Sequence, residues 1–129
     1  KTLIIYKRHL KNLNLYPPIG LEYDLKLVNL AKKNFEKLSY TRKDVIVLNE
    51  NALNSRKYIK SKEAIIYLYN SFQGKTFDDT LDSLKDLPHV LIYIDPVERS
   101  KLIARGYKII AENIGRYNAN TWIVAILSL

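Results

Sequence analysis

Short apolar runs alternate with segments of helical periodicity along most of this chain, and two such runs follow each other at its end. The expected strands are 19–23, 45–48, 64–69, 90–94, 107–111 and 121–127. Strands that alternate with helices form a mostly parallel sheet with helices on both faces. The last two runs are joined only by the turn-rich segment 115–120, so they pair antiparallel. The sequence therefore predicts an α/β fold whose mostly parallel sheet ends in an antiparallel hairpin.

Three segments between the strands have the pattern of amphipathic helices, and they are 25–38, 76–87 and 96–105. Asp24 precedes the first segment as an expected N-cap, and Gly106 follows the third as an expected C-terminal glycine. In the first segment, the apolar positions that recur at helical spacing are Leu27, Ala31, Phe35 and Leu38.

Several aromatic and histidine residues are expected to be structural. Tyr67, Tyr69 and Tyr93 lie in continuous apolar runs, which are typical of strands buried on both faces, so we expect them in the core. His9 and His89 have no partner at metal-ligand spacing, and we expect both to be structural or solvated. No metal site is expected.

The 129 residues and 47% hydrophobic content fit one domain spanning 1–129. There is no apolar run near the ~20 residues that cross a bilayer, and no signal-peptide pattern, so we expect a cytoplasmic protein without membrane contact. The absence of cysteine excludes disulfides, thiolate metal sites and cysteine nucleophiles. The oligomeric state stays open.

The net charge of +8 is concentrated in the first half of the chain. Residues 1–62 hold 14 Lys/Arg against 5 Asp/Glu, whereas residues 63–129 hold 7 against 8. A basic half attracts polyanions such as nucleic acid. The lysines lack an arginine-rich or aromatic-interleaved pattern, which favours a solvated surface, but a basic nucleic-acid-binding α/β domain remains an alternative.

The run 19–23 has a carboxylate near its end and turns directly into the helix 25–38. In open α/β sheets, a carboxylate at the carboxyl end of a strand is placed to accept hydrogen bonds from ribose hydroxyls. Glu22 is therefore a candidate ligand of a nucleoside-type cofactor.

In the order of its motifs, the segment 19–129 resembles the class I S-adenosylmethionine-dependent methyltransferases, which have a Rossmann-like fold. Ile19 to Asp24 is similar to the family's second strand, and the resemblance implies that Glu22 binds the cofactor ribose while Tyr23 packs against the adenine. Asn51-Ala52 stands where the family has an Asp-Ala pair that contacts the adenine, with the Asn51 amide oxygen accepting from the adenine amino group. S-adenosylmethionine is thus the expected cofactor.

The run 65–72 resembles the family's fourth strand and its Asn-Pro-Phe-type motif, with Ser71 in place of the proline. The resemblance implies that Asn70 lies at the cofactor and orients the methyl acceptor, and that Phe72 stacks on a planar acceptor. Asn70, Ser71 and Phe72 are therefore the expected catalytic group. The hairpin 107–127 resembles the family's last two strands. The acceptor itself is open.

The sequence departs from this family at the first strand and its Gly-x-Gly loop. None of the four glycines, at 20, 74, 106 and 115, begins such a motif. We expect that about 20–30 residues, the length of a strand–loop–helix unit, belong between Pro18 and Ile19. The alternative is that residues 2–6 supply the strand and residues 7–15 the helix, within an N-terminal helical segment 1–18. An inactive methyltransferase-like binding module also remains open.

Overall fold

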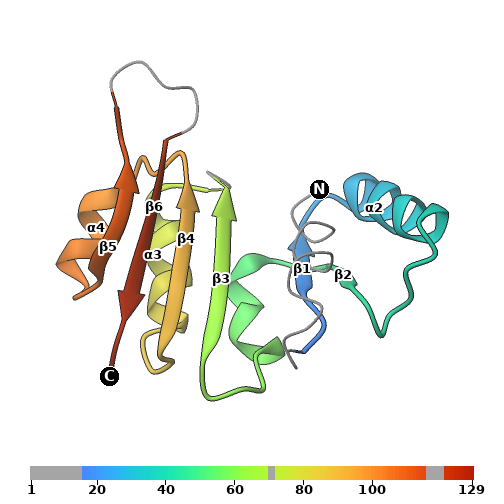
Figure 1. Ribbon diagram of the computed structural model, residues 1–129, viewed down its shortest axis with the longest axis horizontal. Helices are drawn as coiled ribbons and strands as arrows, with labels where there is room; N and C mark the ends of the chain where they lie inside the picture. Colours follow the sequence, from blue (N-terminus) through green and yellow to red (C-terminus); the bar gives the residue numbers. More distant parts are fainter. Residues whose placement is uncertain (1–15, 70–71, 116–120) are drawn as a thin grey trace. The chain divides into compact units, whose positions relative to one another are not determined.

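The computed structural model describes residues 16–69, 72–115 and 121–129, which form two compact units (Figure 1). The first unit ends at Tyr58 and the second begins at Ile59. The first contains β1 (Ile19–Glu22), α2 (Leu25–Lys37), β2 (Ile46–Asn49) and the 3-10 helix η1 (Ala52–Tyr58). The second contains β3 (Ala64–Tyr69), α3 (Gly74–Ser83), β4 (His89–Ile94), α4 (Arg99–Ala104), β5 (Lys108–Asn113) and β6 (Trp122–Leu127).

In the first unit, the strands β1 and β2 pair in parallel and α2 connects them. Helix α2 begins as predicted, because the Asp24 carboxylate accepts the Lys26 N–H at 2.7 Å. Val28 is fully buried, and Ala31 and Phe35, three and seven residues later, are half-buried on the same side. These three residues form the buried stripe of α2.

The prediction that Leu27 and Leu38 line this stripe was wrong, since they are 50% and 42% exposed. Ala31 and Phe35 belong to both the expected and the observed stripe, and Val28 takes the place assigned to Leu27, so the buried side is turned by less than one residue. The apolar arc of α2 is wider than the surface that the described strands cover, and periodicity alone did not distinguish its two edges.

In the second unit, the sheet has the order β3-β4-β6-β5. Strand β3 is parallel to β4, while β6 runs antiparallel to both β4 and β5. The predicted closing hairpin is confirmed, with a register shift between Ile109 and Ala111 in β5. The chain thus has the predicted α/β fold, with parallel pairs of strands and a C-terminal antiparallel pair.

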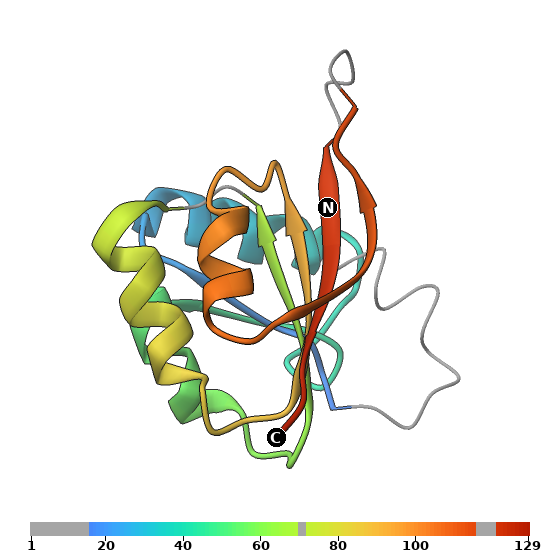
Figure 2. The ribbon, with the colours of Figure 1, turned by 90° about the vertical axis from the view of Figure 1, so that its left-hand side faces the viewer.

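Helices α3 and α4 lie on one side of this sheet (Figure 2) and close a core on it. The Phe77 ring from α3 stacks on Tyr93 of β4, with 5.4 Å between the ring centroids. Asp78 of α3 joins the two helices, because it pairs with Lys101 at 2.9 Å and with Arg105 at 2.7 Å. The buried core cluster consists of Phe77, Leu81, Leu91, Tyr93, Leu102, Tyr107, Ile123, Ala125 and Leu127.

The face of β3 that points away from α3 and α4 is exposed, which corrects the expectation that the tyrosines of this strand lie in the core. Tyr67 and Tyr69 are 42% and 63% exposed, whereas Tyr93 is buried as expected. Successive side chains of a strand point to opposite faces, and the helices cover only the face to which Tyr93 points. The apolar run 64–69 therefore reflects an edge strand with one face covered within its unit.

Strands β1 and β3 each have one partner within the described ranges, β2 and β4 respectively. Each therefore leaves one edge without a strand beside it there. The segments 2–6 and 7–15, the alternative source of a further strand and helix, lie outside the described residues, as does most of the expected helical segment 1–18. No helix in the described ranges is both long and apolar enough to cross a membrane.

Candidate functional site

The candidate site in the first unit lies where β1 and β2 end. Both strands run in the same direction, so their carboxyl ends lie at the same end of the strand pair. Glu22 is the register partner of Asn49 there. The turn into α2 follows β1, and η1 follows β2. The predicted residues of the cofactor site therefore lie in one unit, at or just after the carboxyl ends of β1 and β2: Glu22, Tyr23, Asn51 and Ala52.

Glu22 is half-buried, and its carboxylate is only partly used by the protein. One oxygen, Oε1, accepts the Asp24 N–H at 2.9 Å, which fixes the side chain over the turn between β1 and α2. The second oxygen has no partner among the residues that the structure describes. The carboxylate is thus held in place and keeps acceptor capacity for a ligand hydroxyl.

Asn49 holds the end of β1 in position, a role that the sequence analysis missed. Its Nδ2 donates to the carbonyl oxygens of Glu22, at 3.1 Å, and Tyr23, at 2.7 Å. The Glu22 carbonyl also accepts the Glu50 N–H at 3.1 Å. A polar residue at the end of the apolar run 45–48 is the signal that would have pointed to this contact.

Glu50 organises the segment after β2 and was also missed. Its carboxylate accepts from Asn54 Nδ2 at 2.9 Å, from the Tyr58 hydroxyl at 2.8 Å and from the Asn51 N–H at 2.8 Å. These bonds, led by that from Asn54, lower the pKa of Glu50, and the bond to Glu50 raises the pKa of Tyr58. Glu50 is therefore an ionised anchor for η1, with both oxygens engaged.

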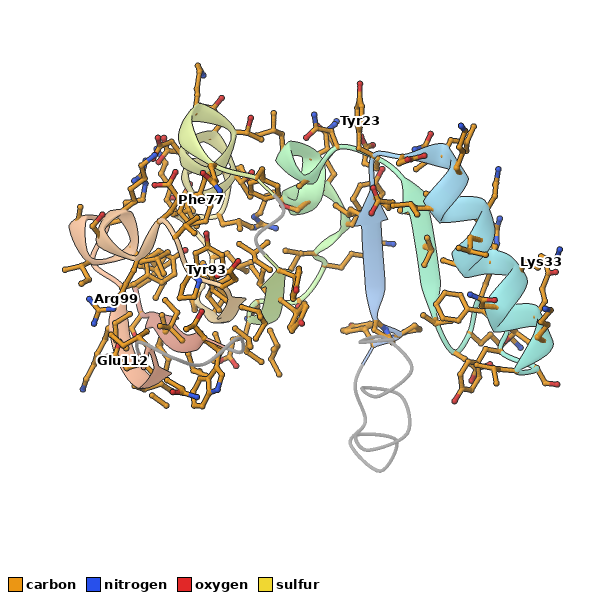
Figure 3. The ribbon with its side chains drawn as sticks, turned by 90° about the horizontal axis from the view of Figure 1, so that it is seen from above. Tyr23, Lys33, Phe77, Tyr93, Arg99 and Glu112 are labelled. Carbon is orange, nitrogen blue, oxygen red and sulfur yellow. The ribbon has the colours of Figure 1, made fainter. Side chains whose placement is uncertain are left out.

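Asn51 uses the atom that the resemblance assigned to adenine. Its Oδ1 accepts the Leu53 N–H at 2.9 Å, as in an N-cap of η1, which begins at Ala52. Its Nδ2 has no partner in the described part of the chain. The amide nitrogen is thus fully available to donate a hydrogen bond to a ligand. The oxygen can accept one more hydrogen bond through its second lone pair. Tyr23 is 80% exposed and points into solvent from the end of β1 (Figure 3).

The expected catalytic group belongs to the second unit. Asn70 and Ser71 lie outside the described residues. The Phe72 ring is partly buried against the core, 6.3 Å from Phe77 between centroids. Asp95, directly after β4, has a φ of 53°, a left-handed conformation that Asp tolerates better than most residues, and its N–H donates to the Thr121 carbonyl at 2.8 Å.

The arrangement in the first unit suits a diol and a flat polar ring. A carboxylate oxygen is available at the end of β1, and an amide follows the end of β2. The carboxylate oxygen can accept hydrogen bonds from ligand hydroxyls and the amide nitrogen can donate one. The sequence contains no Gly-x-Gly motif. Within the described ranges, no three His, Cys, Asp or Glu side chains form a group that could hold a metal ion.

No family model and no curated protein matches this sequence, but solved structures match its fold. A Haemophilus influenzae protein described as a methylase has a TM-score of 0.62 at 12% identity, with 98% of each chain covered. Magnesium protoporphyrin IX methyltransferase from Synechocystis PCC 6803, solved with bound SAM, has a TM-score of 0.63 at 12% identity, covering 98% of this chain and 77% of that chain. TrmK from M. capricolum, in complex with S-adenosylhomocysteine, has a TM-score of 0.58 at 21% identity, covering 95% and 55%. At these identities the matches establish the fold, and the chain has the α/β fold found in these methyltransferases.

Proposed function

We propose that this chain is an S-adenosylmethionine-dependent methyltransferase in which Glu22 binds the cofactor ribose. The observation that carries the proposal is the Glu22 carboxylate at the end of β1, which is fixed through one oxygen and free at the other within the described residues. Two structures of the same fold were solved with SAM or S-adenosylhomocysteine, which supports this choice of ligand.

Each residue at the ends of β1 and β2 has a proposed role. Glu22 accepts hydrogen bonds from the ribose hydroxyls, and Asn49 positions it by fixing the backbone of the turn. Tyr23, which is exposed, covers the adenine face, and the Asn51 amide nitrogen donates to a ring nitrogen. Ala52 is a small residue at the start of η1 that leaves room for the ring.

The cofactor supplies an electrophilic methyl group on a sulfonium, and the transfer is an in-line displacement. Such a reaction depends on alignment and electrostatics more than on strong acid–base chemistry. We assign the acceptor side to the predicted group Asn70, Ser71 and Phe72, with the Asn70 amide oxygen orienting an acceptor N–H.

The missing first strand is part of this proposal. In the described ranges β1 and β3 each have one edge without a neighbouring strand, which is consistent with a further strand–loop–helix unit of about 20–30 residues. We propose that this unit belongs between Pro18 and Ile19 and carries the loop for the methionine end. An intact mass of the natural protein several kDa above 15.0 kDa supports this, and a mass at 15.0 kDa refutes it.

Calorimetry with S-adenosylhomocysteine tests the cofactor site. We expect saturable binding by the intact chain and about ten- to a hundredfold weaker binding by Glu22→Gln, because hydrogen bonds to a charged group contribute about 1.5–3 kcal/mol. Glu36→Gln on exposed α2 is the matched control and should bind like the parent. Absence of binding at millimolar ligand would refute the proposal and favour a binding module without cofactor.

A further inference from the structure

Helix α2 has a row of lysines along its outer surface that the cofactor site does not use. Lys26, Lys33 and Lys37 are spaced by seven and four residues, so they share one side of the helix, and all three are exposed. We call these three residues the lysine face of α2. From its first to its last member, the face is about 16 Å long at about 1.5 Å per residue.

The lysine face is the outermost part of the first unit's helix. At about 100° per residue, its three members lie about 180° around the helix from the buried stripe of Val28, Ala31 and Phe35. Figure 3 shows Lys33 pointing away from β1 and β2. A ligand that approaches α2 from solvent within this unit therefore meets the lysines first.

The lysine face is also electrostatically unsatisfied among the described residues. None of its three ammonium groups forms an ion pair there, and the segment 25–43 contains six Lys/Arg but Glu36 as its one acidic residue. In the second unit, by contrast, Lys101 and Arg105 are held by carboxylates. Cations that hold the fold together are paired, and those of α2 are available to a partner.

The partner that fits a straight row of cations is a polymer with regularly spaced anions. Double-stranded DNA, for example, carries one negative charge per about 1.7 Å of its axis when both strands are counted, so about nine phosphate charges lie along about 16 Å of such a duplex. An anionic membrane fits less well because, of the exposed leucines of α2, Leu30 alone lies within the lysine face, between Lys26 and Lys33. Leu25, Leu27 and Leu38 lie about 100–120° around the helix from this face and would not enter the same surface.

We infer that the lysine face of α2 is a docking surface for the phosphate backbone of a nucleic acid. Binding of a nucleic acid to this surface requires neither a bound cofactor nor catalytic activity. Only the further step, that this nucleic acid is the methyl acceptor, rests on the proposed function. In that step, α2 would hold the backbone while the carboxyl ends of the strands hold the cofactor.

Fluorescence anisotropy with a labelled 20-base-pair RNA duplex tests the inference. The triple variant Lys26→Gln, Lys33→Gln, Lys37→Gln should bind about tenfold or more weakly at about 100 mM salt. Its plot of log affinity against log salt should be less steep by about 2–3, since each lost phosphate contact removes about one unit of slope. Gln keeps helix propensity, so circular dichroism should be unchanged.

A second triple variant with the same change of charge separates local docking from net charge. Lys75→Gln, Lys85→Gln, Lys108→Gln alters exposed lysines of the second unit and should bind the duplex nearly as the parent does. Equal losses in the two triple variants, or no binding by the parent at 50 mM salt, would overturn the inference. So would lysine-face-dependent binding to phosphatidylserine vesicles with none to RNA, which would assign the surface to a membrane.

The duplex measurement tests the docking surface and the S-adenosylhomocysteine titration tests the proposed function, and either claim can be refuted without the other. Duplex binding that depends on the lysine face, in a protein that does not bind S-adenosylhomocysteine, leaves the docking surface standing and refutes the proposed function. Cofactor binding without duplex binding refutes the docking surface and leaves the function with another acceptor.

Discussion

The two compact units differ in what their side chains are used for. In the second unit, Leu91 and Ile123 are fully buried within a continuous core. In the first unit, Val28 is fully buried, but Leu27 and Leu30 of the same helix are half exposed. The candidate cofactor residues and the lysine face belong to this less buried unit. The comparison indicates that the buried core that stabilises the fold and the proposed ligand-binding residues belong to different parts of the chain.

The polar interactions show the same division. In the second unit, His89 is buried between the Leu87 carbonyl, 2.7 Å from Nδ1, and the Tyr107 hydroxyl, 2.7 Å from Nε2. In the first unit, Asn49 and Glu50 hold loops at the ends of the strands and leave part of the Glu22 carboxylate unused. The His89 ring of the second unit is thus closed into the core, whereas the Glu22 carboxylate of the first unit keeps an oxygen without a partner among the described residues.

The largest expected effect is a difference in the free energy of unfolding between two Leu→Ala variants, one in each unit. Leu91→Ala removes a fully buried side chain of β4 and should lower the free energy of unfolding by about 2–5 kcal/mol. Leu30→Ala removes a side chain of α2 that is 54% exposed and should change it by about 0.5 kcal/mol or less. Urea titrations of both variants measure the difference. Similar losses would show that Leu30 is covered in the protein in solution, which would break the comparison.

The next effect is a dependence of stability on pH that originates in the second unit. Burial lowers the pKa of His89 below its usual 6.5, against a smaller opposite effect of the Leu87 carbonyl. The unfolded chain then binds more protons than the folded one below about pH 6.5. The free energy of unfolding should therefore fall as the pH falls through this region, by up to about 1.4 kcal/mol per pH unit.

Urea titrations at pH 7.5 and 5.5 check this expectation, with His89→Gln as the comparison. The variant lacks the titrating ring, so the difference between its two values should be smaller than in the parent. An unchanged difference would assign the pH dependence to other groups.

Tyr107→Phe should lower the free energy of unfolding at pH 7.5 by about 1–3 kcal/mol, because it removes the hydroxyl that donates to the buried ring nitrogen of His89.

Features that depend on near neighbours in the chain could be predicted from the sequence. Asp24 caps α2 through a bond to a residue two positions away, and Gly106 follows α4 with a φ of 82°. The hairpin followed from the absence of a helix between its strands. These features are determined locally, so periodicity and cap residues were sufficient to find them.

Features that depend on distant partners could not be predicted in this way. Asn49 bonds a carbonyl 26 positions earlier in the chain, and nothing in its own surroundings identifies that partner. The exposed faces of Tyr67 and Tyr69 depend on which side of the sheet α3 and α4 cover, which an apolar run does not encode. For the candidate site, the ends of β1 and β2 were predictable, but the use of Asn51 Oδ1 by the Leu53 N–H was not.

The smallest effect decides whether the two units unfold separately. Asp24→Ala removes the carboxylate that caps α2 and should cost about 1 kcal/mol, whereas Asp24→Asn should keep most of the cap. If the first unit opens by itself, amide hydrogen exchange in α2 should become about fivefold faster in Asp24→Ala while β4 is unaffected, because the loss is confined to one unit. Equal acceleration in α2 and β4 would mean that the chain unfolds as one cooperative body. The exposed leucines of α2 would then mark a surface within a single structure, and the division between a stable unit and a proposed ligand-binding unit would be lost.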